Sequence, residues 1–566
     1  MRTAVKCVIC SGQRVYYAFS VQKYRLMGCR DCGHMMLNPP PSPSDLAGIY
    51  GVQYEFWNEN EDRRIRLSEM KRATATHYLE LIGRYRGGHG GDLLEIGCGQ
   101  GDFLVMARDA GYHVTGVEDT ASGSEVASSR LEGRGTVVQG DISDLGHVAG
   151  TFDVCVLSDV LERAYNPRTF LHEVHHLLKP GGVLFVATPT LDSWSARFLK
   201  QAWMGFKPER LHYFNRNTLH TLLFQTGYEH VVGLPGSKFL SPEYIVDNLE
   251  KNPASKVSLA VRLANALLPR AFRTRHLRMG ASGMIAIGTS SAIPARRKLS
   301  IILPAYNESA TLDTVLQALL EKDLEPLDKE VVLVESNSTD GTREIALQYA
   351  HHPNVQLVLE DRPQGKGHAV RTGLEHATGD FILIQDADLE YDFEDYEVLL
   401  EPILNGRMAF VLGSRHGGKT WKLRRFEGQW GISKFLNIGH WLFKTLVNVF
   451  YGLNLKDPFT MYKVFRRDCL TGLTFECNHF DFDYELLIKL VRNGYVPKEI
   501  PVNYRSRSFA EGKKVSVWRD PWTWLRAIVK FRFTSIDVLA NVPKSASSSE
   551  TAPRVAATAA GVRSDL

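Results

Sequence analysis

The strongest constraint on the fold of this chain is a pattern that occurs twice: short apolar runs alternate with helix-like stretches. The first set runs from DLLEIG at residue 92 to GGVLFVATP at residue 181, and the second begins with KLSIILPAYNE at residue 298. Such alternation predicts parallel sheets covered by helices, so we expect an α/β fold class. The polar segment SSAIPARRK separates the two sets, and 566 residues are enough for at least two cores.

Charge and hydropathy narrow the environment of the protein. The 67 Lys and Arg residues nearly balance the 63 Asp and Glu residues, which argues against nucleic acid as a main partner. The N-terminus MRTAVKCVIC lacks the apolar core of a signal peptide, and no stretch offers the roughly 18 uncharged apolar residues of a membrane span. We therefore expect a cytoplasmic protein. Residues 435–453 and 518–533 carry Trp and Phe beside Lys and Arg, which predicts either ordinary core helices or a peripheral surface on the cytoplasmic face of a membrane.

Four of the eight cysteines form two pairs, CVIC and CRDC, near the N-terminus. Eighteen residues separate Cys7 and Cys10 from Cys29 and Cys32, a spacing typical of a knuckle in which four thiolates hold zinc. Gly33 follows the second pair, where such a turn favours positive φ. The pattern predicts a closed, structural Zn²⁺ site.

A glycine-rich turn, DLLEIGCGQGDF, follows the first apolar run. Gly97, Gly99 and Gly101 would let the backbone approach a ligand closely. Glu118 closes the next run, HVTGVE, where an acid can hold two ribose hydroxyls. These residues by themselves leave open a dinucleotide, as in a dehydrogenase, S-adenosylmethionine, or a turn without a ligand.

Four successive segments, LLEIGCGQG, QGDISDL, FDVCVLSDVLER and LLKPGGVLFVATP, resemble the motifs of the Rossmann-like S-adenosylmethionine-dependent methyltransferases. The resemblance covers residues 75–235. It implies that the segment from Glu95 to Gly101 surrounds the methionine part of the cofactor and that Glu118 binds the ribose. It also implies that Asp141 and Ile142 border the adenine.

The acceptor side of this region carries a weaker pattern. HYFNRNTL resembles the acceptor-side segment of the same family, which makes His212 a candidate catalytic base or substrate contact, whereas Arg163 replaces the usual histidine of a Leu-Glu-His pattern. A zinc knuckle ahead of such a domain is similar to methyltransferases of sugars and small metabolites. HEVHH at residues 172–176 matches the H-E-x-x-H pattern of zinc proteases, but the methyltransferase pattern places an ordinary amphipathic helix there. The remaining alternative for this half is a binding module without catalysis.

The second set of alternations contains QDADLEYD directly after the apolar run FILI. Asp386, Asp388 and Glu390 occupy alternate positions, and alternate residues of a strand point the same way. We therefore expect the three carboxylates to converge just past the strand end, where they would suit a hard divalent cation such as Mg²⁺ or Mn²⁺.

The segments around this cluster, SIILPAYNES, VVLVESNSTDGT, GKGHAVRTGLEHATGDFILIQDADL and VLGSR, resemble the family 2 nucleotide-sugar glycosyltransferases, inverting enzymes with a GT-A fold. KDPFTMYKVFRRD and EIPVNYRSRSFAEGKKVS look closest to the dolichyl- and polyprenyl-phosphate sugar synthases. The resemblance implies that Asp386 and Asp388 are catalytic and that Asp388 and Glu390 bind the metal. Expected contacts to the nucleotide-sugar donor are Pro304, Tyr306, Glu308, Glu335, Lys366, Asp386 and Arg415, and expected contacts to an acceptor phosphate are Arg507, Lys513 and Lys514.

The acceptor decides whether this half needs a general base. A polyprenyl phosphate is largely dianionic near neutral pH and can attack the anomeric carbon without one. A saccharide hydroxyl would need a carboxylate to remove its proton, and Asp457, Asp483 and Glu485 are then the candidates.

These features together predict four regions. They are a zinc knuckle at 1–45, a methyltransferase domain at 46–294, a GT-A glycosyltransferase domain at 295–540 and a Ser- and Ala-rich disordered tail at 541–566. We expect a bifunctional enzyme of glycan or glycolipid biosynthesis that moves a sugar from a nucleotide donor to a polyprenyl phosphate, with a saccharide as the alternative acceptor.

Overall fold

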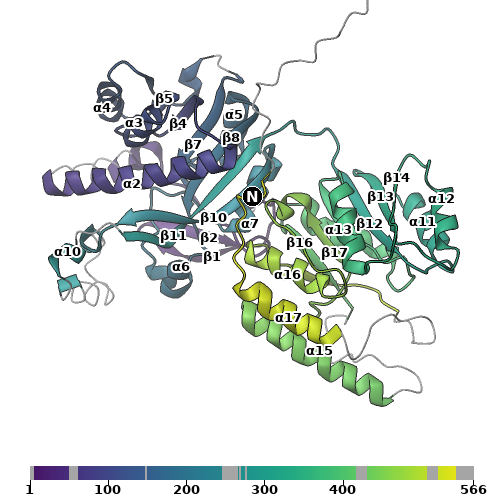
Figure 1. Cartoon of the computed structure of the whole chain (residues 1–566). Helices are drawn as coiled ribbons and strands as arrows, with labels where there is room; N and C mark the ends of the chain where they lie inside the picture. Colours follow the sequence, from purple (N-terminus) through teal and green to yellow (C-terminus); the bar gives the residue numbers. More distant parts are fainter. Residues whose placement is uncertain are drawn as a thin grey trace, which may run out of the picture.

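A computed structural model describes residues 5–46, 48–49, 61–146, 149–244, 246, 265–266, 269–273, 277–415, 430–505 and 520–542. Within these ranges the chain forms two seven-stranded sheets and one four-stranded sheet, each seven-stranded sheet carrying helices (Figure 1). The predicted α/β class is confirmed. The disordered tail expected at 541–566 lies outside the described residues beyond Val542.

The first large sheet has the strand order β10-β11-β8-β7-β4-β5-β6. Its strands are β4 (Gly91–Ile96), β5 (Tyr112–Glu118), β6 (Thr136–Gln139), β7 (Phe152–Ser158), β8 (Leu178–Pro189), β10 (Tyr228–Leu240) and β11 (Leu277–Ser290). The helices of this half are α2 (Glu61–Arg86), α3 (Asp102–Asp109), α4 (Ala121–Leu131), α5 (Pro167–Leu177), α6 (Trp194–Leu199), α7 (Arg216–Gln225) and α10 (Arg270–Arg273). β4 to β8 are parallel, and the chain winds outward from β4 in both directions. In such sheets a ligand crevice opens at the carboxyl ends of the central strands, here β4 and its neighbours.

The second large sheet has the order β14-β13-β12-β15-β17-β16-β18. Its strands are β12 (Lys298–Ala305), β13 (Asp328–Glu335), β14 (Val355–Leu359), β15 (Phe381–Ile384), β16 (Phe410–Ser414), β17 (Lys463–Arg466) and β18 (Lys498–Pro501). The helices are α11 (Leu312–Glu321), α12 (Thr342–Gln348), α13 (Lys366–His376), α14 (Tyr396–Leu404), α15 (Trp430–Tyr451), α16 (Phe482–Arg492) and α17 (Asp520–Phe533). β12 to β15 are mutually parallel, whereas β17 is antiparallel to both β15 and β16.

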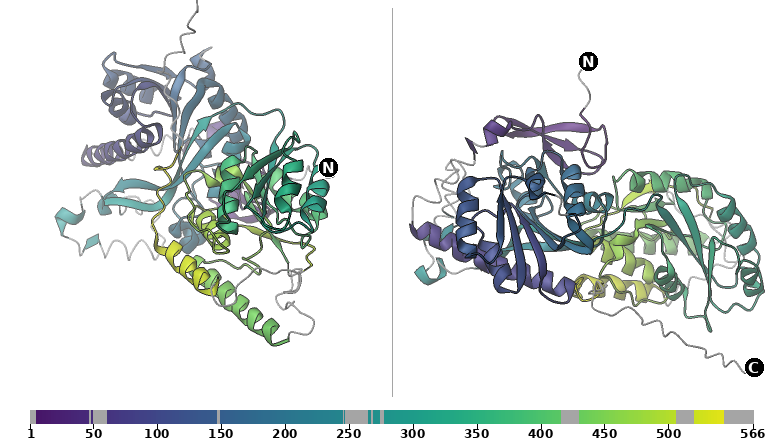
Figure 2. Two further views of the ribbon diagram at one scale, coloured as in Figure 1. Left: turned by 45° about the vertical axis from the view of Figure 1, so that its right-hand side comes forward. Right: turned by 90° about the horizontal axis from the view of Figure 1, so that it is seen from above.

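The cysteine-rich region forms a small sheet of β1 (Val15–Val21), β2 (Tyr24–Cys29) and β3 (Met35–Leu37), which lies along one side of the N-terminal half (Figure 2). Its fourth strand, β9 (His212–Tyr213), comes from far along the chain and pairs antiparallel with β3. The region predicted at 1–45 therefore shares a sheet with the region that follows it. The predicted boundaries themselves stay predictions.

Helix α7 joins the two halves. The Arg466 guanidinium, 1% exposed, donates to Thr221 Oγ1 at 2.9 Å, and Arg297 donates to the Phe224 carbonyl at 3.2 Å. His220 hydrogen-bonds the Tyr495 hydroxyl in the same buried region. Because buried polar groups are costly to separate, these bonds hold α7 against the second half.

The segment after α17 returns to the N-terminal half (Figure 1). Val538, Leu539 and Val542 are buried in the same apolar cluster as residues of α2, β4 and α3, and Arg84 donates to Asp537 at 2.8 Å. Both halves are therefore linked at α7 and again at residues 537–542.

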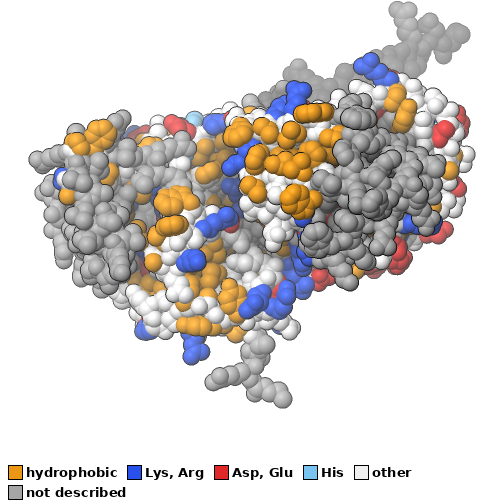
Figure 3. Space-filling view, turned by 90° about the horizontal axis from the view of Figure 1, so that it is seen from below, with side chains coloured by type: hydrophobic (Ala, Val, Ile, Leu, Met, Phe, Trp, Pro, Cys, Tyr) orange, Lys and Arg blue, Asp and Glu red, His pale blue; other side chains and the backbone are white. Residues whose placement is uncertain are grey.

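Helices α15 and α17 lie together at the lower edge of the molecule in Figure 1. Figure 3 shows the face seen from below, where apolar side chains gather beside Lys and Arg. Among the side chains of the two helices that the structure describes, the exposed large apolar residues are Trp441, Leu442, Val449, Trp522, Val529 and Phe533. No helix in the described part of the chain is long and apolar enough to cross a membrane.

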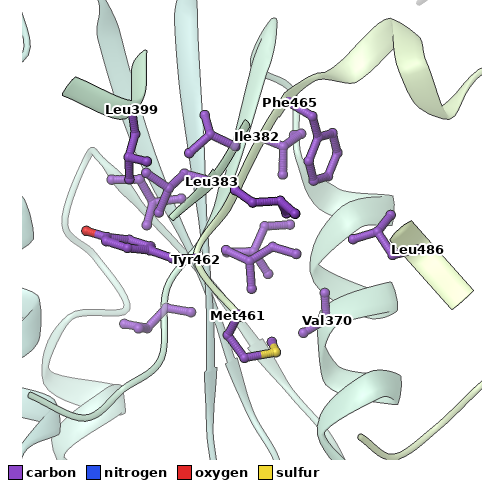
Figure 4. Packing of buried hydrophobic residues seen from close by; sticks show 14 of the residues in the cluster. Val370, Ile382, Leu383, Leu399, Met461, Tyr462, Phe465 and Leu486 are labelled. Atoms are coloured by element: carbon purple, nitrogen blue, oxygen red, sulfur yellow. The ribbon is translucent and has the colours of Figure 1, made fainter. Parts of the chain in front are cut away.

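The largest core surrounds β15 (Figure 4). Ile382 and Leu383 are fully buried among Val370 of α13, Leu399 of α14 and Leu486 of α16. Close packing of this kind fixes the strand and hence the position of the loop that leaves it at Gln385.

Candidate functional site

The first candidate site is the glycine turn between β4 and α3. Gly97, Gly99 and Gly101 have φ of 71°, 54° and 76°, where a side chain would be strained. A Cβ built on Gly99 would have no heavy atom within 4 Å, so the turn is open on that side. The loop thus offers free backbone at the carboxyl end of β4.

Glu95 lies beneath this turn. Its side chain is 5% exposed, and its Oε2 atom makes no hydrogen bond in the described residues. Burial and then the nearby Asp102 carboxylate raise the pKa of Glu95 well above its usual value. A buried acceptor atom without a donor fits a cationic ligand group, and the α-ammonium group of S-adenosylmethionine is one.

The ribose and adenine residues expected from the resemblance lie at the same sheet edge. Glu118 accepts from the Gly99 amide at 2.8 Å and from the Thr120 hydroxyl at 2.6 Å. Asp141 begins the 3₁₀ turn that contains Ile142, and its carboxylate accepts from the Ser143 amide at 2.8 Å. The fold brings these residues next to the glycine turn, while their contacts to a cofactor stay predictions.

His212 lies in β9, the strand that the first half contributes to the knuckle sheet. It is 5% exposed, its Nδ1 lies 3.2 Å from Nε2 of the buried His34, and burial lowers the pKa of His212 to about 4. The pair packs the interface between the knuckle sheet and the first large sheet. A role for His212 as base or substrate contact stays a prediction, because the side chain does not face an open surface.

The acceptor side also contains a group of charged residues that was not predicted from the sequence. Asp159 follows β7, Glu162 lies in the next 3₁₀ turn, and Arg210 and Lys238 come from later segments. In the sequence, the two acids directly after a central strand could have indicated this group. The two cations are too far along the chain to be linked to them by any local pattern.

The four cysteines of the knuckle converge. Cys7 and Cys32 sulfurs lie 3.6 Å apart, Cys10 and Cys29 sulfurs lie 3.7 Å apart, and all four lie within 4.8 Å of one another. For a Zn–S bond of about 2.3 Å, a tetrahedron has sulfur–sulfur edges of about 3.8 Å. The cluster therefore has the dimensions of a four-thiolate metal site, and Gly33 has the expected positive φ, 77°.

The helix that contains HEVHH, α5, is amphipathic, as the methyltransferase pattern predicts. Leu171, Val174 and Leu177 are buried, and His175 bonds the Ser291 carbonyl oxygen at 2.9 Å.

The carboxylates of QDADLEYD are not on a strand, so their prediction as alternate strand residues is wrong. β15 ends at Ile384, so the acids lie in the turn beyond it.

The ligand atoms of Asp386, Asp388 and Glu390 do not all lie within 4.8 Å of one another. Among the described residues the four cysteines are the only group of three or more metal-ligating side chains within 4.8 Å. Glu390 accepts from the Tyr504 hydroxyl at 2.6 Å, and Asp388, 5% exposed, accepts from the Glu390 amide at 3.1 Å. A carboxylate has two oxygens, so the hydrogen bond from Tyr504 does not exclude Glu390 as a metal ligand together with Asp388, and that role stays a prediction.

Two cations lie beside this turn. Lys366 forms an ion pair with Asp386; burial would lower the pKa of Lys366, but Asp386 and Asp483 raise it. Arg415 makes a bidentate pair with Asp457 at 2.7 and 2.8 Å. This edge of the sheet thus combines acids with positive charge that could face a diphosphate.

The other residues expected to contact the nucleotide-sugar donor differ in their exposure to solvent. Pro304, Tyr306 and Glu308 lie at the carboxyl end of β12, where Tyr306 is 38% exposed. Glu335 is fully buried; it accepts from the Ser338 amide at 2.7 Å and forms an ion pair with Arg343 at 2.9 Å. A direct contact between Glu335 and a donor would therefore require its loop to rearrange.

All three candidate general bases are buried in ion pairs. Arg415 holds Asp457, Lys463 Nζ lies 2.6 Å from Asp483, and Lys489 pairs with Glu485. Glu485 also accepts from the amides of Glu476 and Cys477. The expected acceptor-phosphate residues Arg507, Lys513 and Lys514 lie outside the described residues.

Each half of the chain is similar to known proteins. Residues 300–471 match the model of glycosyl transferase family 2, and residues 66–232 match a methyltransferase domain. A dolichyl-phosphate beta-glucosyltransferase of Trichomonas vaginalis is 32% identical over 237 residues, which cover 40% of this chain and 70% of that protein. The chain belongs to the family 2 glycosyltransferases. Both resemblances predicted from the sequence are confirmed, and the glycosyltransferase half is fused to a methyltransferase domain.

Other relatives match smaller shares. A low-salt glycan biosynthesis hexosyltransferase of Haloferax volcanii is 30% identical over 237 residues, 40% of this chain and 52% of that protein. The glycosyltransferase half thus spans about half the length of this relative. A glucosyl-3-phosphoglycerate synthase structure from Mycobacterium tuberculosis has 22% identity and a TM-score of 0.32, and covers 42% of this chain and 80% of its own. YcgJ from Bacillus subtilis has 14% identity and a TM-score of 0.30, and covers 38% and 100%. These scores are low, so the family matches decide the assignment.

Proposed function

We propose that the chain is a bifunctional enzyme of glycan or glycolipid biosynthesis. Its glycosyltransferase half moves a sugar from a nucleotide donor to a polyprenyl phosphate, and its methyltransferase half moves a methyl group from S-adenosylmethionine to an acceptor. The observation that carries the choice of lipid phosphate is the pairing of Asp457, Asp483 and Glu485 with buried cations. A carboxylate held in a buried ion pair is a weak proton acceptor, and a phosphate nucleophile needs none.

Divalent metal and donor would meet at the loop after β15. Asp388 and Glu390 would bind Mg²⁺ or Mn²⁺, which would offset the charge that develops on the leaving nucleoside diphosphate. Lys366 and Arg415 lie at the same edge and would contact the phosphates or orient the acids. In the other half Glu95 and the glycine turn would hold the cofactor, and the four cysteines would hold a structural Zn²⁺.

Peripheral membrane contact would bring the enzyme to a lipid acceptor. Trp441 of α15 is 57% exposed, and Trp522 and Phe533 of α17 are 73% and 80% exposed. Lys530 and Arg532 lie in the last turn of α17. Exposed aromatic side chains with neighbouring cations suit an anionic bilayer surface, on the cytoplasmic face, better than bulk water.

The test is a sugar-transfer assay with the full chain, Mg²⁺ or Mn²⁺, radiolabelled UDP- and GDP-sugars and a polyprenyl phosphate. We expect label in the lipid phase from one donor, and its loss in Asp388→Ala but not in Asp323→Ala, a surface acid outside the site. Donor hydrolysis without labelled lipid would contradict the lipid acceptor and favour a saccharide hydroxyl.

A further inference from the structure

Tyr504 lies where the segment that follows β18 passes the turn after β15. Its backbone forms an antiparallel bridge with Tyr391, and the Arg505 amide donates to the Glu390 carbonyl at 2.8 Å. These backbone contacts hold the two segments together. Tyr504 is therefore fixed beside the turn on which Asp388 and Glu390 are expected to bind a divalent metal.

The hydroxyl group of Tyr504 contacts the side chain of Glu390. It donates to the Oε2 atom at 2.6 Å, a distance typical of a strong hydrogen bond from a hydroxyl to a carboxylate. Because the Tyr504 backbone is tied to the same turn, this bond restrains the orientation of the Glu390 carboxylate. One expected metal ligand is thus held in place by a residue from more than a hundred positions later in the chain.

The ring of Tyr504 lies beside Arg415, an expected contact to the nucleotide-sugar donor. The guanidinium carbon of Arg415 is 5.4 Å from the ring centroid, within the range of about 6 Å for a cation–π contact. The Tyr391 ring packs against the Tyr504 ring with centroids 5.1 Å apart. Tyr504 therefore touches an expected metal ligand with its hydroxyl and an expected donor contact with its ring.

This arrangement has a consequence for metal affinity. A flexible carboxylate loses side-chain freedom when it binds a metal, so a carboxylate that is already oriented binds the metal more tightly. Removing a group that hydrogen-bonds to a metal ligand typically weakens metal binding about 10- to 100-fold. Carboxylate oxygens such as those of Asp388 and Glu390 suit Mg²⁺ or Mn²⁺.

We propose that Tyr504 is a positioning residue for the metal and the donor in sugar transfer. Its hydroxyl fixes the orientation in which Glu390 binds the metal, and its ring supports Arg415 at the donor phosphates. The inference rests on the proposed glycosyltransferase function, with Asp388 and Glu390 as metal ligands. It adds the residue that joins the metal ligands to the donor contacts.

The test titrates the full chain with Mn²⁺ and measures free Mn²⁺ by electron paramagnetic resonance, without nucleotide and with UDP or GDP. Tyr504→Phe removes the hydroxyl and keeps the ring. We expect it to raise the Kd for Mn²⁺ about tenfold or more. Sugar transfer by this variant should fall at low Mn²⁺ and recover at saturating Mn²⁺, which a general loss of structure would not allow.

Tyr391→Phe is the matched control. It removes a hydroxyl from the neighbouring ring, where the hydroxyl bonds Thr460 at 3.2 Å, and should leave the Kd for Mn²⁺ within about twofold of the wild type. In a Glu390→Ala background, Tyr504→Phe should not weaken Mn²⁺ binding further, because the hydroxyl acts through that carboxylate. Tyr504→Leu, which also removes the ring, should raise the donor KM at saturating Mn²⁺, whereas Tyr504→Phe should not.

The outcomes separate this inference from the proposed function. A wild-type Kd for Mn²⁺ in Tyr504→Phe, or an equal further loss in the Glu390→Ala background, would overturn the role of the hydroxyl. Equal donor KM values for Tyr504→Leu and Tyr504→Phe would overturn the role of the ring. A wild-type chain that binds no Mn²⁺ with either nucleotide would instead overturn the proposed metal site, and this inference with it.

Discussion

Replacing Glu95 with glutamine tests the cofactor site most directly. The amide keeps the size of the side chain but removes its charge. A hydrogen bond to a charged group contributes about 1.5–3 kcal/mol. At about 1.4 kcal/mol per tenfold change in affinity, Glu95→Gln should weaken binding of S-adenosylmethionine about 10- to 100-fold.

The pKa of Glu95 adds a second signature. Because burial and Asp102 raise this pKa, part of the ligand-free protein carries a neutral Glu95, and binding of an ammonium group should release its proton. The wild-type Kd should therefore fall as the pH rises toward the ligand-free pKa of Glu95. The variant should lose this dependence, and calorimetry in buffers of different ionisation enthalpy would measure the proton release.

The free energy of unfolding of the ligand-free protein should fall as the pH rises, whereas the affinity for S-adenosylmethionine should increase. A carboxyl group whose folded-state pKa is raised binds more protons when folded, so it lowers stability as the pH rises above its unfolded value of about 4.3. Ligand-free Glu95→Gln should thus be at least as resistant to urea as the wild type near neutral pH. Glu132→Gln, on the surface, serves as control. A variant that binds the cofactor within twofold of wild type and keeps the pH dependence would refute the assignment.

Three further outcomes are expected. Cys10→Ser should lose bound zinc, measured by atomic emission; full zinc retention would contradict the four-thiolate site. Lys463→Met leaves the Asp483 carboxylate without its buried cation and should destabilise the protein by about 3–5 kcal/mol in urea denaturation. The double variant Lys463→Met, Asp483→Asn should recover most of this stability. Equal destabilisation of the single and the double variant would contradict a buried ion pair. Joint replacement of Trp522 and Phe533 by alanine should weaken sedimentation with anionic phospholipid vesicles about tenfold at unchanged folding; equal binding would place α17 away from the bilayer.

Local sequence patterns were enough to predict most of the fold and part of each candidate site. Apolar runs predicted the strands, and the position of Gly97 after one of them predicted an open turn at a sheet edge. The same reasoning misplaced Asp388, because a run of alternating acids looks like a strand continuation when the strand has already ended. His212 illustrates the other limit, since its partner His34 comes from 178 residues earlier in the chain. Contacts of that separation depend on tertiary packing and leave no periodicity to detect.

The return of Val538, Leu539 and Val542 to the first half has a consequence for synthesis. The ribosome makes these residues long after it has finished the sheet that they cover. Until then, part of the apolar surface between α2 and β4 has no partner and is available to chaperones and proteases. A chain interrupted in its second half would leave its first half incomplete, so quality control in the cell would remove the two activities together.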